Sequence, residues 1–123
     1  MFKKDVILHI CTCHSWEEAQ EQGEYRSQSL TTEGFIHCSK PDQVLTVANH
    51  FYQDTPDLVI LWIDPQKVEN EIKYEPGTDN PSEAFPHIYG PLNMGAVLAV
   101  SDLKPASDGI YKDVPGVEQF LMK

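Results

Sequence analysis

Positive charge is scarce in this chain of 123 residues. It carries 9 Lys and Arg against 19 Asp and Glu, a formal net charge of −10, and Arg26 is its single arginine. Non-specific nucleic-acid binding depends on clustered Lys and Arg that neutralise phosphates, so we expect none here. A single arginine also argues against a site built from several bidentate guanidinium clamps.

Cysteines and long apolar runs are also scarce. Three Cys residues are an odd number and too few for a disulfide framework. The first residues lack the apolar run of a secretory signal, so we expect a cytoplasmic protein with reduced thiols. No stretch approaches the ~18 apolar residues of a membrane-spanning helix, so no membrane partner is expected.

Familiar catalytic motifs are missing as well. The chain contains no G-x-G-x-x-G, P-loop, H-E-x-x-H or G-x-S-x-G pattern. Its length and its hydrophobic content of 41% fit one compact domain over residues 1–123. We expect the core at about 5–103 and a loop-rich tail at 104–123.

Hydrophobic patterns predict helices early in the chain and mostly strands later. The predicted strands are 6–11, 34–39, 58–63, 71–75, 85–89 and 96–100, and the predicted helices are 16–22 and 41–52. Strand 6–11 is apolar on both faces, so we expect it to be central in its sheet. The first helix follows a capping box at Ser15 with Glu18, and Gly23 ends it. Segments 24–33 and 76–83 are expected to be loops, and the order of elements indicates an α+β domain.

Two short segments, Gly34–Ser39 and Phe85–Leu92, each place a histidine between apolar residues, and we expect them to meet at a pocket. In a strand, His37 lies on the opposite face from its neighbours, and His87 shares a face with Tyr89. These imidazoles could bind a ligand or transfer a proton. The alternative is a structural role, with each histidine bonded to backbone or closing an aromatic patch.

The residue types suggest three other candidate sites. His9, Cys11 and Cys13 would share one strand face, but the paired-cysteine spacing of a zinc site is absent, so no metal is expected. Cys38 is flanked by His37, yet adjacent strand residues face opposite sides, which argues against a thiol nucleophile. Glu75, at a strand end, is either a base or a solvated terminus.

Several of these segments together resemble the family called domain of unknown function 952 (DUF952). The resembling segments are Trp16–Tyr25, Gly34–Ser39, Gln43–Phe51, Leu58–Asp64, Lys73–Glu75 and Phe85–Val97. They cover most of the chain up to about Leu103. The pairing of Gly-Phe-Ile-His-x-Ser with Phe-Pro-His-x-Tyr-Gly carries the resemblance.

A more distant resemblance, through Leu8–Thr12 and the Gly-led strand after it, is to the ADP-ribosyltransferase and RNA 2′-phosphotransferase fold. It implies two early helices on a split, mainly antiparallel sheet, with NAD as a substrate in the cleft rather than a firmly bound cofactor. The residues that it implies are His37 and His87 for catalysis, His9, Thr12, Ser39 and Tyr89 for ligand binding, and Glu75 as a candidate base. Ser39 would hold phosphate at the N-terminus of the next helix.

The sequence therefore predicts a small domain with a His-lined cleft for a nucleotide-like small molecule. The leading hypothesis is NAD-using group transfer. The alternatives are a non-catalytic nucleotide-binding or sensor domain, and a metal-binding protein built from the same histidines. Whether the domain is catalytic, and what its oligomeric state is, stay open at this point.

Overall fold

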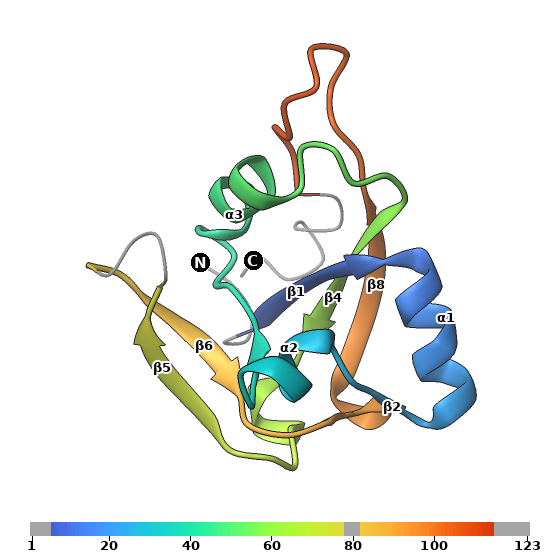
Figure 1. Ribbon diagram of the computed structural model, residues 1–123, viewed down its shortest axis with the longest axis vertical. Coiled ribbons are helices and arrows are strands. Elements are labelled where there is room, and N and C mark those ends of the chain that lie inside the picture. The colour runs from blue at the N-terminus through green and yellow to red at the C-terminus, as the bar shows by residue number, and fades with distance from the viewer. Residues whose placement is uncertain (1–5, 78–81, 115–123) are drawn as a thin grey trace, which may run out of the picture.

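The computed structural model describes residues 6–77 and 82–114, and within them every strand pairing is antiparallel. A central sheet has the order β1-β4-β8, and a second sheet has the order β3-β6-β5 (Figure 1). Strands β2 and β7 form a two-stranded ribbon. The strands are β1 (Ile7–Thr12), β2 (Glu24–Tyr25), β3 (Ile36–His37), β4 (Leu58–Ile63), β5 (Ile72–Pro76), β6 (Ala84–Ile88), β7 (Leu92–Asn93) and β8 (Val97–Leu103).

Helices cover both faces of the central sheet. They are α1 (Cys13–Gln22), α2 (Gln28–Thr32) and α3 (Val44–Phe51), with short 3₁₀ turns η1 (Pro65–Lys67) and η2 (Met94–Ala96). Helix α1 packs on the face that also meets the second sheet, and α3 packs on the other face. None of the helices in the described part of the chain is long and apolar enough to cross a membrane.

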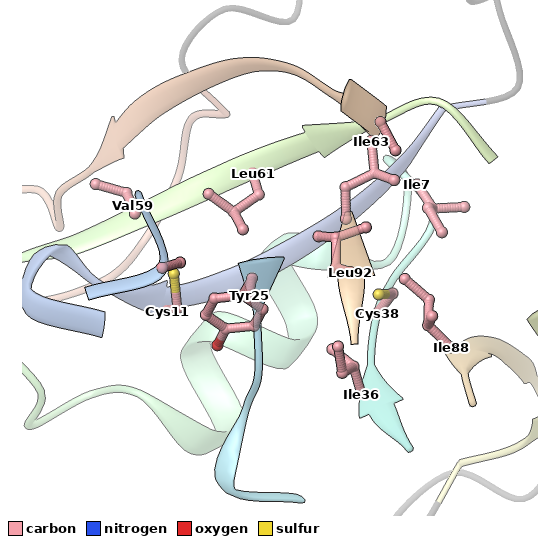
Figure 2. Packing of buried hydrophobic residues seen from close by; sticks show 12 residues of the cluster. Ile7, Cys11, Tyr25, Ile36, Cys38, Val59, Leu61, Ile63, Ile88 and Leu92 are labelled. Atoms are coloured by element: carbon pink, nitrogen blue, oxygen red, sulfur yellow. The ribbon is translucent and has the colours of Figure 1, made fainter. Parts of the chain in front are cut away.

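The alternating side chains of β1 and β4 build two cores, one on each face of the central sheet. One core, shown in Figure 2, contains Ile7 and Leu61 together with Ile36 and Ile88 from the second sheet. The other contains Trp62, which is fully buried, and includes residues of α3 and Tyr111. Tyr111 lies in the segment predicted to be a loop-rich tail, so the core extends beyond Leu103.

Within the described residues, one isolated β-bridge joins the two sheets. Leu8 and Ser39 exchange backbone hydrogen bonds of 2.8 and 2.7 Å, and beyond this point β1 and β3 diverge. The predicted central place of β1 is wrong, because β1 lies at the edge of the order β1-β4-β8. Both faces of β1 are apolar because a core packs on each face of the central sheet, and this can also be true of an edge strand.

The α+β class and the antiparallel arrangement are confirmed, whereas several element boundaries differ. Strand β4 has the predicted bounds, but the segment 34–39 is regular only at Ile36–His37, and α2 forms inside a predicted loop. Helix α1 begins three residues before the predicted start because Thr12, not Ser15, is its N-cap. Helix α3 begins at Val44 rather than near residue 41. The predictions for the middle of the 76–83 loop and for the end of the 104–123 tail fall outside the described residues.

Candidate functional site

The carboxylate of Glu75 on β5 collects two hydrogen bonds from β6 and the residue after it. Nδ1 of His87 donates to Glu75 Oε1 at 2.8 Å, and the Tyr89 hydroxyl donates to the same oxygen at 2.6 Å. The bond from Tyr89 and then that from His87 hold the pKa of Glu75 below its usual value. The bond to Glu75 also raises the pKa of Tyr89 to about 12. Glu75 is therefore the acceptor of a fixed carboxylate–histidine–tyrosine group.

This hydrogen bonding decides which nitrogen of His87 is free. Because Nδ1 carries the proton that Glu75 accepts, Nε2 of the neutral ring holds the lone pair. All buried side-chain nitrogens and oxygens of the described residues have hydrogen-bond partners, and Nε2 has none among those residues. Nε2 is therefore not completely buried, and it keeps a small contact with the molecular surface in a side chain that is 7% exposed. An oriented imidazole with one accessible nitrogen is the usual form of a general base or acid.

Aromatic rings surround His87 on this face of the second sheet. Phe35 stacks on the His87 ring, with centroids 4.2 Å apart and an interplanar angle of 18°. His37 meets Phe35 and His87 edge to face, at 4.8 and 5.2 Å. Tyr89 lies 5.2 Å from Phe35. We call Phe35, His37, Glu75, His87 and Tyr89 the histidine cluster.

Strand register explains why these residues meet. His37 on β3 pairs with His87 on β6, and His87 pairs with Lys73 on β5. Residues paired across antiparallel strands lie on the same face, and residues two positions along a strand share that face. Lys73 accordingly places its Nζ 4.8 Å from the centre of the Tyr89 ring.

A second imidazole–carboxylate contact lies at the rim of the cluster. His37 Nε2 is 3.0 Å from Glu33 Oε2, and the two side chains are 44% and 46% exposed. Helix α2 and the turn after it bring Glu33 to this position. The predicted contrast between His37, which is exposed, and its buried neighbours Ile36 and Cys38 is confirmed.

The structure places three of the predicted binding residues away from the cluster surface. His9 is buried, and its two ring nitrogens contact the carbonyl of His37 and the hydroxyl of Tyr25. Thr12 caps α1 by accepting from the Ser15 backbone at 3.1 Å. Ser39 is buried and bridges to β1. The expectation that Ser39 lies at a helix N-terminus is wrong, because α3 begins only at Val44. A ligand contact from His9 would require one of its present bonds to break.

The thiols are placed for packing. Cys38 is buried, and burial raises its pKa well above the usual range of a thiol. The predicted sharing of a strand face by His9, Cys11 and Cys13 is wrong for Cys13, since it is the first residue of α1. Within residues 6–77 and 82–114, no group of three or more His, Cys, Asp or Glu side chains is arranged to hold a metal ion.

A cavity of about 600 Å³ lies elsewhere, between the loop before β4 and the end of β8. Its lining includes Cys13, Asp57, Asp102 and Tyr111. No residue of the histidine cluster lines it. The chemistry-bearing side chains and this cavity are therefore separate features of the molecule.

The sequence interpretation missed Phe35, Glu33 and Lys73 as parts of the site. Phe35 precedes His37 by two residues, so strand alternation already put it on the same face. The position of Glu33 depends on α2, and the polar composition of that segment gave no helix prediction. The position of Lys73 beside Tyr89 depends on the register between β5 and β6, which a local sequence pattern does not determine.

Comparison with other proteins agrees with the fold and leaves the activity open. A crystal structure of protein CC0527 from Caulobacter crescentus is 28% identical, covers 87% of this chain and 93% of that chain, and has a TM-score of 0.77. The solution NMR structure of CC0527 gives 28% identity, coverage of 88% and 92%, and a TM-score of 0.75. No functionally curated protein matches the chain. The model of the family described as "Protein of unknown function (DUF952)" matches residues 10–100, most of the sequence, and the chain belongs to the DUF952 family.

Proposed function

We propose that the protein is an NAD-using group-transfer enzyme of the ADP-ribosyltransferase-like type, with His87 as its proton-transfer residue. The observation that carries the proposal is the bond from His87 Nδ1 to Glu75, which leaves His87 Nε2 accessible beside Phe35 and His37. The antiparallel sheets that diverge from a single bridge add support, because a split sheet is what the ADP-ribosyltransferase resemblance implies.

The proposed reaction begins with cleavage of the bond between C1′ of the ribose and the nicotinamide nitrogen. The bonding electron pair leaves with nicotinamide, and the oxygen of a water or an acceptor hydroxyl forms a new bond to C1′. The proton of that oxygen passes to His87 Nε2. Glu75 then stabilises the resulting imidazolium through Nδ1, as a carboxylate does in other acid–base pairs.

Ligand binding in this proposal falls to the rim of the cluster. The half-buried ring of Phe35 and the exposed ring of His37 provide apolar faces for a planar heterocycle. Lys73, beside Tyr89, supplies positive charge for a phosphate. Arg26 is already paired with Glu24 at 2.6 Å on β2 and is given no part in binding.

Calorimetric titration of the folded wild type with NAD and with ADP-ribose tests binding, and chromatographic detection of free nicotinamide tests turnover. We expect binding of both ligands and slow nicotinamide release. No binding contradicts the proposal, and binding without release favours the non-catalytic sensor instead.

His87→Gln tests the assignment of the reacting group. We expect it to bind NAD but to lose at least about 10²-fold in turnover, the range of a lost general base. His14→Gln is the matched control, because His14 lies on α1 with a side chain that is 80% exposed. If both variants release nicotinamide at the wild-type rate, His87 is not the proton-transfer residue.

A further inference from the structure

The imidazole of His9 fills the point where β1 and β3 separate. One residue before it, Leu8 still pairs with Ser39 through two backbone hydrogen bonds. At His9 the backbone pairing has ended, and ring Nδ1 donates to the carbonyl oxygen of His37 instead. The side chain of His9 thus continues the contact between the two sheets for one further step.

The register of β3 explains why this carbonyl needs a side-chain partner. Cys38 N–H donates to the carbonyl of Pro86 at 3.0 Å, so the adjacent pair, His37 and His87, is a non-hydrogen-bonded pair. The C=O of His37 consequently points away from β6. His9 supplies the donor that a further strand would otherwise supply, and a buried carbonyl without a donor is unfavourable.

A chain of hydrogen bonds fixes the tautomer of His9. The carbonyl oxygen of His37 only accepts, so Nδ1 carries the proton and Nε2 accepts from the Tyr25 hydroxyl at 2.8 Å. Cys11 lies beside Tyr25 in the core between the sheets (Figure 2). Burial lowers the pKa of His9 to about 4, so the ring is neutral near pH 7.

We infer that His9 is a positioning residue for the histidine cluster. By holding the main-chain carbonyl of His37, it fixes where the His37 and Phe35 rings stand against His87. The expected effect of this role on turnover rests on the proposed function. Its structural part, the bond from Nδ1 to the carbonyl of His37, stands without any ligand.

The structural part is tested on the wild type by long-range ¹H–¹⁵N NMR of the histidine rings. We expect the Nδ1–H tautomer for His9 at pH 7, with no protonation down to about pH 5. The opposite tautomer, or a His9 ring that takes up a proton near the ordinary pKa of 6.5, overturns the inference. Neither outcome depends on whether NAD is a substrate.

The positioning part is tested with three variants. His9→Phe removes the donor, and we expect an altered His37 ring signal and a loss of about 10²-fold in kcat, the effect of misplacing a reacting group by about 1 Å. His9→Asn restores a donor, since the amide nitrogen is attached to Cγ as Nδ1 is, and we expect most of kcat to return. Tyr25→Phe is the control, because it removes a buried hydrogen bond but keeps the donor to His37, so we expect lower stability and normal kcat.

The outcomes separate the two proposals. If His9→Phe is folded, with unchanged His37 and His87 signals and unchanged kcat, the positioning role is refuted while group transfer stands. If the signals move and His9→Asn restores them, but the wild type neither binds nor cleaves NAD, the positioning role stands and the proposed function is refuted. If Tyr25→Phe loses as much kcat as His9→Phe, the effect is general destabilisation and the inference is refuted.

Discussion

Acidification should destabilise the protein through His9, and the size of the effect follows from its buried position. Burial lowers the pKa of His9 from 6.5 to about 4, because the charged ring would lose its hydration in the core. In the unfolded chain the ring takes a proton below pH 6.5, whereas the folded protein excludes that proton until about pH 4. The unfolded state therefore binds more protons between these values, and stability falls as the pH falls.

The expected loss is large relative to ordinary domain stability. Integrating the difference between the two pKa values gives about 2 kcal/mol by pH 5 and about 3 kcal/mol by pH 4, relative to pH 8. Small domains are typically stable by about 5–15 kcal/mol, so this single ring would account for a substantial part of any acid sensitivity.

The assay is urea unfolding from pH 8 to pH 4, followed by the fluorescence of Trp62, which is fully buried. His9→Asn, which cannot take a proton in this range, should show a curve of stability against pH that is flatter by the amounts given above. Lowered pKa values at Glu75 and Asp108 also reduce stability in acid, but they act on both proteins and cancel in the difference. Parallel curves for the wild type and His9→Asn would refute the reasoning.

Three further predictions concern stability and are measured by thermal unfolding. Thr12→Ala should lower the free energy of unfolding by about 1 kcal/mol, or the Tm by roughly 3–5 °C, because α1 loses its N-cap. Ser15→Ala should have a smaller effect, because the backbone N–H of residue 15 keeps its bond to Thr12. Equal effects of the two substitutions would contradict the assignment of Thr12 as the cap. Gly90→Ala should lower the free energy of unfolding by more than about 1 kcal/mol, because φ of Gly90 is +153° and the new Cβ would overlap the Asn70 side chain. If adding Asn70→Ala recovers none of this loss, the overlap is not its cause. Leu61→Ala should cost about 2–5 kcal/mol, because Leu61 is fully buried in the core between the sheets, and a loss under 1 kcal/mol would be inconsistent with that packing.

The histidine cluster was partly predictable from local patterns. Strand alternation predicted that His37 lies on the opposite face from Ile36 and Cys38 and that His87 shares a face with Tyr89, and both are confirmed. Glu75 was singled out as a carboxylate at a strand end, and it is the acceptor for both His87 and Tyr89. The inferences about His37, His87 and Tyr89 needed only the two-residue period of a strand, and the one about Glu75 needed only its place at a strand end.

The placement of His9 was not predictable in this way. The strand predicted at 6–11 is present as β1, and His9 lies on the same strand face as Cys11, as expected. What the local pattern lacks is the identity of the groups that meet that face, namely Tyr25 from β2 and the carbonyl of His37 from β3. Helix starts were misjudged for a related reason: Thr12 and Ser15 are both good caps, and the end of β1 decides between them.

The sequence by itself determined the α+β class, the buried strand at Leu58–Ile63 and the two histidine segments, because periodicity and turn residues act within a few positions of the chain. Only the tertiary structure decided that β1 is an edge strand, that α2 brings Glu33 to His37, and that His87 is oriented by Glu75 across two strands. These features depend on strand order and register, which are set by the packing of segments far apart in the sequence. The same packing buries His9 between the sheets, where its Nδ1 donates a hydrogen bond to the backbone carbonyl of His37.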